Sequence, residues 1–211
     1  MGGSASKATR QSRNREATQA SILAAAEEEF ALHGLANTRI DPIAARTGVT
    51  KTMIYYYFQS KEGLYQAVLE RGFKEYVRPL QKLNLDPLPP ESALEQFVRC
   101  LLSSLVSNPN WPLIMCYEAL QNQGSYYEQV GIQSIDAQLV AILERGVASG
   151  SFRSLEPRHT ATDIMGICVF YFLGRENIKH LFPGKRMLSK KRLEQHIQQA
   201  IALIMAGVRP E

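Results

Sequence analysis

Apolar residues recur at three- and four-residue spacing along nearly the whole chain, and no segment alternates between apolar and polar positions as a half-buried strand would. The first helical segment, residues 11–33, places Ile22, Ala26 and Phe30 on one face and stops at Gly34, a residue type that favours helix ends. Further helices are expected after Thr38 and at residues 51–58, 61–79, 91–107, 111–123, 125–149, 157–181 and 189–208. The pattern predicts an all-α fold.

Capping residues mark the starts of the short helices near the N-terminus. Thr38 and Asp41, three residues apart, match a capping box for the second helix. Thr50 and Ser60 can cap the third and fourth helices through their hydroxyl oxygens. The N–H groups at the start of the fourth helix, together with Lys61, are predicted to form an anion site.

The second and third helices are joined at a glycine. Ala44, Gly48 and Ile54 have the spacing of a helix-turn-helix motif, which needs a small residue at the close contact, a glycine at the turn and a branched anchor. The rest of a small core would come from Ile43, Val49 and Phe58. These residues predict a DNA-binding unit that ends near residue 60.

The third helix carries too many aromatic residues to bury them all. Because a helix turns about 100° per residue, three consecutive tyrosines cannot all face inward when Ile54 and Phe58 do. The opposite face is predicted to carry Lys51, Thr52, Tyr55 and Tyr56, with Tyr57 on a flank. Phenol hydroxyls can donate to phosphate, and Lys51 or Thr52 can reach base edges, so this face is predicted to contact double-stranded DNA.

Composition and charge agree with a globular DNA-binding protein. The chain has 211 residues, 45% hydrophobic and 21% charged, with a formal charge of +4. Residues 1–15 carry four cations and no acid. The longest apolar run near the C-terminus is about ten residues, short of the roughly 18 that span a bilayer, and no signal-peptide pattern is visible. A cytoplasmic location without membrane contact is therefore expected.

The stretch FALHGLANTRIDPIAARTGVTKTMIYYYFQSKEGLY, residues 30–65, resembles the DNA-binding region of the TetR family of bacterial transcription regulators. The resemblance implies a homodimeric, all-helical repressor whose third helix enters the major groove and whose C-terminal domain binds a small effector. By position, it implies backbone contacts for Thr38 and Lys61. It implies recognition-helix contacts for Lys51, Thr52, Tyr55, Tyr56 and Tyr57, with Thr50 at the start of the same helix.

We therefore expect a flexible basic tail at residues 1–10, a helix-turn-helix domain at residues 11–60, and a helical effector-binding and dimerisation domain at residues 61–211. The last two helices are very apolar, and we interpret them as a homodimer interface, with a purely intrachain core as the alternative. In the last helix the interface set is Ile197, Ala200, Ile201, Ile204, Met205 and Val208.

The effector pocket is expected among the middle helices, for a small, largely apolar or aromatic molecule. The candidate lining residues are Trp111, Met115, Tyr117, Glu118, Tyr126, Tyr127, Met165 and Phe172. No cofactor is expected. His159 and Asp163, four residues apart, could hold a metal but are the usual polar surface of a helix start, so no metal site is predicted.

Two other functions are considered. The four histidines show no pairing with nucleophiles or carboxylates that would favour a helical enzyme. A constitutive DNA-binding protein without an effector stays open, because the sequence does not reveal whether the C-terminal helices enclose a cavity. The three cysteines are widely spaced and are expected to be reduced core residues.

Overall fold

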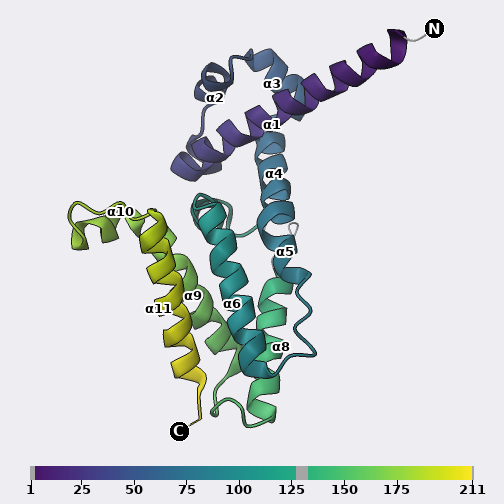
Figure 1. Ribbon diagram of the computed structural model, residues 1–211. Coiled ribbons are helices and arrows are strands. Elements are labelled where there is room, and N and C mark those ends of the chain that lie inside the picture. The colour runs from purple at the N-terminus through teal and green to yellow at the C-terminus, as the bar shows by residue number, and fades with distance from the viewer. Residues whose placement is uncertain (1–2, 127–132, 211) are drawn as a thin grey trace.

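The computed structural model describes residues 3–126 and 133–210, and every regular element within them is a helix (Figure 1). Helices α1 (Gly3–Asn37), α2 (Ile40–Thr47) and α3 (Lys51–Phe58) gather at one end of the molecule. The chain then passes along α4 (Lys61–Gly72) into the larger C-terminal body. None of the described helices combines the length and the apolarity needed to cross a membrane.

The C-terminal body is a helical bundle in which α6, α8, α9 and α11 run alongside one another (Figure 1). Its elements are a π-helix at Phe73–Val77, α5 (Arg78–Gln81), α6 (Pro90–Ser107), α7 (Trp111–Asn122), α8 (Gln133–Ala148), α9 (Pro157–Leu173), α10 (Arg175–Ile178), a 3-10 turn at Lys179–Leu181, and α11 (Lys190–Val208). Helix α7 packs on α1, so it links the body to the N-terminal unit.

Helix α1 is longer than its apolar periodicity indicated. Residues 3–10, for which a flexible tail was expected, form its first turns. Two alanines, Lys7 and Arg10 have high helix propensity and favour these turns, whereas Gly3, two serines and Thr9 do not. At the other end, Gly34 leaves the helical conformation with a φ of 69°, and a side chain there would collide with Gln121 of α7.

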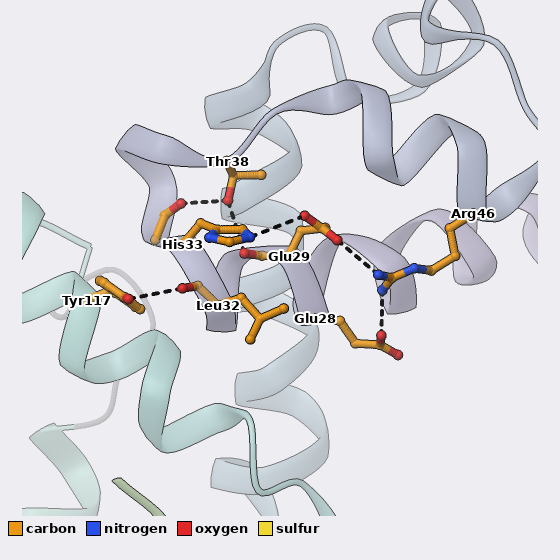
Figure 2. Close-up of polar contacts among 8 residues, drawn as sticks. Glu28, Glu29, Leu32, His33, Thr38, Arg46 and Tyr117 are labelled. Atoms are coloured by element: carbon orange, nitrogen blue, oxygen red, sulfur yellow. Dashed lines mark hydrogen bonds and ion pairs between the residues drawn. The ribbon is translucent and has the colours of Figure 1, made fainter. Parts of the chain in front are cut away.

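The predicted caps are confirmed for α3 and α4 but not for α2. The hydroxyl oxygens of Thr50 and Ser60 accept hydrogen bonds from the third N–H that follows each of them, at 3.2 and 2.9 Å. Helix α2 instead begins after Arg39 without a side-chain cap. The Thr38 hydroxyl lies beside the end of α1 and donates to the carbonyl oxygens of Gly34 and Glu29 (Figure 2). The unpaired carbonyls at that helix end compete successfully for the hydroxyl.

Several C-terminal boundaries also differ from the expectation. The helical path that begins at Lys61 continues past Pro79, since α4 leads through the π-helix into α5. Proline is tolerated there because Pro79 lies in the first turn of α5, where its missing N–H would have no partner within the helix. Helix α9 ends at Leu173, before Gly174, where a longer helix was expected. Helix α8 begins at Gln133, and part of the expected 125–149 helix lies outside the described residues.

The apolar face of α11 packs inside the chain, where a dimer interface was predicted. Ile201 and Ile204 are 8% and 3% exposed, and Ala200 and Val208 are buried as well. Helix α11 lies against α6 and α9, which cover this face. Periodicity identifies an apolar face but does not say whether its partner belongs to the same chain. These residues are therefore core residues of the subunit.

Candidate DNA-contacting surface and ligand cavity

Helix α3 presents its polar and aromatic side chains to solvent and buries one anchor. Ile54 is fully buried, whereas Tyr55 and Tyr56 are 43% and 72% exposed. Lys51, Thr52 and the N-terminal cap Thr50 are exposed beside them. The helix lies at the end of the molecule that is farthest from the C-terminal bundle (Figure 1). An approaching duplex can therefore reach this face without displacing any other described element.

Tyr57 lies on the flank of the same helix and is partly buried. Its ring meets those of Tyr56 and Phe58 edge-on, with centroids 5.4 and 6.3 Å apart. The guanidinium of Arg15 lies 5.6 Å from the Tyr57 ring centroid, within the range of a cation–π contact. Tyr57 thus connects the basic first part of α1 with the recognition face.

Lys51 is paired with an acid of the preceding helix. Its Nζ lies 2.5 Å from the Asp41 carboxylate, and this hydrogen bond lowers the pKa of Asp41. Both side chains are about half exposed, so the pair contributes little to stability. Lys51 can therefore exchange Asp41 for a phosphate or a base edge when DNA approaches.

Thr38 and Lys61, the two residues for which backbone contacts with DNA were expected, instead hold the turn between α1 and α2. Thr38 is 3% exposed and its hydroxyl is used inside the protein. The Lys61 ammonium donates to the carbonyl oxygens of Ala36 and Thr38, at 3.1 and 3.3 Å. Thr38 is thus unsuited to touch DNA, whereas Lys61, half-buried, keeps a third N–H to donate.

Arg46 fastens α2 to α1, and its role was missed at the level of sequence. Its guanidinium contacts the carboxylates of Glu28 and Glu29, at 2.5 and 3.0 Å (Figure 2). Glu29 is 7% exposed, so this contact is better shielded from solvent than the Lys51–Asp41 pair. The partners are 17 or 18 residues apart in sequence, and no local pattern could have identified them.

A cavity of about 140 Å³ lies inside the C-terminal bundle, and three of the eight predicted pocket residues line it: Trp111, Met115 and Met165. Its other walls include Tyr76 and Val77 of the π-helix and Leu101 of α6, which sequence reasoning missed. The lining is almost entirely apolar, as small-molecule sites commonly are. Burial raises the pKa of Tyr76 to about 12, so its hydroxyl stays protonated at neutral pH.

Glu118 and Tyr126 belong to a buried polar cluster rather than to the cavity wall. The Glu118 carboxylate, 1% exposed, accepts hydrogen bonds from the Tyr65 hydroxyl at 3.1 Å and from the Tyr126 N–H at 2.7 Å. Asn122 donates a third at 2.5 Å. Burial, followed by the nearby Glu118 charge, raises the pKa of Tyr65 far above its usual value. This cluster fastens α4 to α7.

The remaining predicted pocket residues also lie elsewhere. Tyr117 donates its hydroxyl to the carbonyl oxygen of Leu32 at 3.1 Å, at the end of α1 (Figure 2). Phe172 is fully buried and packs edge-on against Tyr171 and His196, between α9 and α11. Tyr127 lies outside the described residues. The predicted aromatic residues outside the cavity therefore serve separate contacts: Tyr117 joins α7 to α1, Tyr126 belongs to the Glu118 cluster, and Phe172 packs between α9 and α11.

A polar bridge of Glu27, Arg71 and Asn108 joins the cavity wall to the N-terminal unit. The Glu27 carboxylate, on α1, contacts the Arg71 guanidinium of α4 and accepts a hydrogen bond from the Asn108 side chain at 2.7 Å. The Asn108 side-chain oxygen accepts a hydrogen bond from the backbone N–H of Trp111. The indole ring of Trp111 packs on Gly72. Glu27 and Asn108 are 7% and 4% exposed. One buried network therefore touches α1, α4 and a residue of the cavity wall.

Helices α9 and α11 each leave one large apolar side chain exposed. Phe170 and Leu203 are 64% and 62% exposed. Gly166 and Gly207 lie beside them, and a side-chain carbon added at either would meet nothing within 4 Å. We call Gly166, Phe170, Leu203 and Gly207 the outer strip. Small residues beside large apolar ones allow another helix to approach closely.

Within residues 3–126 and 133–210, no group of three or more His, Cys, Asp and Glu side chains is arranged to hold a metal ion. His159 and Asp163 are both exposed. The three cysteines are free thiols, and burial raises the pKa of Cys168 to about 12, so it is an unreactive core residue.

Comparison with known proteins matches the two parts of the chain separately. A profile of bacterial regulatory proteins of the tetR family matches residues 22–68, and a profile of tetracyclin repressor-like C-terminal domains matches residues 90–204. The Escherichia coli K12 transcriptional regulator RutR is 26% identical over 203 residues, covering 95% of both chains. The Pseudomonas putida transcriptional repressor NicS is 31% identical over 166 residues, covering 76% of this chain and 78% of NicS.

Solved structures share the fold. A tetR-family regulatory protein from Rhodococcus RHA1 aligns with 92% of this chain and 98% of its own, with a TM-score of 0.72 and 19% identity. HlyIIR, a hemolysin II transcriptional regulator, covers 93% of this chain and 99% of its own, with a TM-score of 0.65 and 24% identity. The N-terminal helix-turn-helix unit and the C-terminal helical domain are thus arranged as in these proteins.

Proposed function

The chain belongs to the TetR family of bacterial regulatory proteins and is a DNA-binding transcription regulator rather than an enzyme, and on this basis we propose that it is a homodimeric repressor released from a palindromic operator by a small-molecule effector. It would act in the cytoplasm, where bacterial DNA lies. The proposal needs three parts: a surface that reads DNA, a surface that pairs two subunits, and a route from the effector to the DNA.

The exposed face of α3 carries the proposal. Lys51, Thr52, Tyr55 and Tyr56 contact DNA in this arrangement, with Thr50 at the helix start and Tyr57 on the flank. Their exposure while Ile54 stays buried is the supporting observation. Lys61 can add one phosphate contact, and Thr38 is not included because its hydroxyl is used internally.

The outer strip of α9 and α11 supplies the subunit contact. Its large apolar side chains are exposed in the single subunit, and its glycines leave room for a facing helix. Two such strips related by a twofold axis would form a four-helix contact and set two α3 helices at a fixed spacing. The interface still lies on the two helices expected from the sequence, but on their outer face.

The effector acts through the cavity wall and the polar bridge. A ligand in the cavity meets Trp111 and the π-helical residues Tyr76 and Val77. Trp111 is tied through Asn108 to Glu27 of α1 and to Arg71 of α4. Moving these groups would re-space the two recognition helices. A coupling of about 1–3 kcal/mol would change operator affinity about 5- to 150-fold.

Selection of DNA fragments by the pure full-length protein tests the proposal. A homodimer should return a pseudo-palindrome whose half-site centres are separated by a multiple of about 34 Å. A single asymmetric half-site would rule the homodimer arrangement out. Effector release is tested with the selected operator. A ligand that lowers operator affinity by some factor must itself bind more weakly, by the same factor, when the operator is present.

The alternative is a constitutive DNA-binding protein. The polar bridge and the cavity favour a ligand-responsive regulator, because a constitutive protein needs neither. If no cavity ligand changes operator affinity while each one alters Trp111 fluorescence, the constitutive alternative replaces the effector-released repressor.

A further inference from the structure

The apolar cavity is too small to hold most effectors whole. At about 140 Å³ it matches a cavity that accepts one benzene ring, whereas typical small-molecule sites occupy about 300–1,000 Å³. A second hollow of about 380 Å³, the α8–α9 groove, opens beside it. Its lining residues are Asp136, Val140, Arg158, Ala161, Thr162 and Met165. Met165 lines both hollows, so they adjoin at its side chain.

One face of α9 leads from the groove to the cavity. Arg158, Thr162, Met165 and Val169 follow one another at four-, three- and four-residue spacing, which places them along a single stripe. Val169 lines the cavity, and Arg158 lines the groove. At 1.5 Å per residue, the Cα atoms of Arg158 and Met165 are about 10 Å apart along the helix axis. A short chain of atoms can span this distance.

Met165 is suited to be a movable partition. Its side chain is only partly buried, unbranched and rotatable about three bonds, and it makes no polar contact with residues 3–126 or 133–210. Turning it aside would open the cavity into the groove without disturbing the helix backbone. A branched side chain at this position would be far stiffer.

The groove carries a cation, Arg158, that has no side-chain partner among the described residues. Arg158 is exposed, and its guanidinium makes no hydrogen bond or ion pair within residues 3–126 and 133–210. The nearby Glu156 carboxylate accepts a hydrogen bond from the backbone N–H of His159, which lowers the pKa of Glu156, and the Arg158 charge adds a smaller lowering effect. Asp136 lies on the opposite wall of the groove. An anionic group would therefore be favoured only at the Arg158 side, where the guanidinium can bind a carboxylate with two parallel hydrogen bonds.

We propose that these two hollows form one site for an amphipathic carboxylate. A single aromatic ring or an equally short alkyl group fills the apolar cavity, a linker passes Met165, and the carboxylate binds Arg158. The inference rests on the proposed function only in calling this molecule the effector, because binding itself does not involve DNA.

The probes are ω-phenylalkanoates, from phenylacetate to 6-phenylhexanoate, with 4-phenylbutanol as the neutral counterpart of 4-phenylbutanoate. Binding to the full-length protein is followed by the fluorescence of Trp111, the single tryptophan, and by calorimetry. Affinity should rise with linker length until the chain spans the two hollows. Arg158→Gln should weaken the carboxylates about 10- to 100-fold, leave 4-phenylbutanol unchanged, and be partly rescued by Arg158→Lys. Arg186→Gln, on the exposed loop before α11 and outside the lining of both hollows, is the matched control.

Three results would overturn the inference: no binding by any member of the series, equal weakening of acid and alcohol by Arg158→Gln, or unchanged acid binding in that variant. Met165→Phe should reduce binding of the longer acids. If that variant does not fold, Val140→Phe replaces it, because a larger side chain there narrows the groove from the α8 side. Acid binding that depends on Arg158 but leaves operator affinity unchanged would uphold the site and refute effector release. Operator release by some other molecule, without binding of the acids, would uphold effector release and refute the carboxylate site.

Discussion

Helices α3 and α11 both carry more apolar and aromatic residues than a solvent-exposed helix needs, yet they use them in opposite ways. On α3, Tyr55 and Tyr56 face solvent and only Ile54 is fully buried. On α11, Ile201 and Ile204 face the bundle, and Leu203 is the large apolar residue left outside. The chemistry of the side chains accounts for the difference, because a phenol has a hydroxyl that keeps a partner in water or on DNA, whereas an isoleucine has none.

The comparison separates two kinds of function in one chain. The candidate DNA-contacting residues of the N-terminal unit protrude from one short helix, α3, which Thr50 caps, so they can be read in sequence order. The candidate ligand residues of the C-terminal bundle instead line a cavity that several helices enclose, so they come from the π-helix, α5, α6, α7, α8 and α9 together. Changing single residues on each helix tests this distinction.

The largest effect is expected from a charge on the outer strip. Leu203→Glu should separate the subunits and, by losing the paired half-sites, lower operator affinity about 10²- to 10⁴-fold, while each subunit stays folded. Light scattering and operator titration measure the two effects. Gln198→Glu, on an exposed position of the same helix, is the control. An intact Leu203→Glu dimer would move the interface elsewhere.

The next effect contrasts the buried residues of α11 with the exposed residues of α3. Ile204→Ala leaves a cavity in the core and should lower the free energy of unfolding by about 2–5 kcal/mol in urea titrations. Tyr56→Ala should change it by less than about 0.5 kcal/mol while weakening operator binding. If Tyr56→Ala destabilised the fold as much as Ile204→Ala, the aromatic face of α3 would be a packing surface and not a DNA-contacting one.

The polar bridge should connect the two units measurably. Asn108→Ala leaves the Glu27 carboxylate without its 2.7 Å donor and should cost about 1–3 kcal/mol of stability. It should also reduce the factor by which a cavity ligand changes operator affinity. Ser103→Ala, on the exposed side of α6, serves as the control. Unchanged coupling in Asn108→Ala would show that the signal travels by another route.

A smaller effect distinguishes Lys51 from Lys61. Lys51→Ala should alter the preference among operator bases, because the ammonium lies at the start of the recognition face. Lys61→Ala should weaken all DNA sequences alike and reduce the slope of log affinity against log salt by about 0.9 if Lys61 contacts one phosphate. A lowered unfolding midpoint with an unchanged salt slope would instead make Lys61 a purely structural residue that holds the α1–α2 turn through Ala36 and Thr38.

The smallest effect concerns pH and the α9–α11 contact. Burial lowers the pKa of His196, which stacks on Tyr171 with ring centroids 4.2 Å apart and interacts with the backbone of Cys168. The unfolded chain therefore binds the proton more readily, so the stability from neutral His196 is complete above about pH 6.5 and is lost as the pH falls toward the folded-state pKa. Replacement by phenylalanine should flatten the decline in urea midpoint between pH 7.5 and 5.5. An identical decline in His196→Phe would assign it to other titrating groups. Arg192, the nearby cation, cannot be one of them because it stays charged throughout this range.

The boundaries of α3, the start of α4, the Gly48 turn and the exposed face of α3 could be predicted from the sequence, because each depends on residues within a few positions of one another. A hydroxyl three residues before an N–H, a glycine with positive φ and a 100° turn per residue are local rules. The same rules failed at Thr38, whose hydroxyl was taken by carbonyls of the preceding helix end.

The sequence by itself determined an all-helical chain with a helix-turn-helix unit near its N-terminus and an apolar C-terminal part. Only the tertiary structure decided that Ile201 and Ile204 are core residues, that three of eight candidates line the cavity, and that Glu27 meets Asn108 across 81 residues of sequence. Periodicity fixes which face of a helix is apolar, because that depends on neighbours in the chain. What covers the face depends on where distant helices pack, and no local spacing records it.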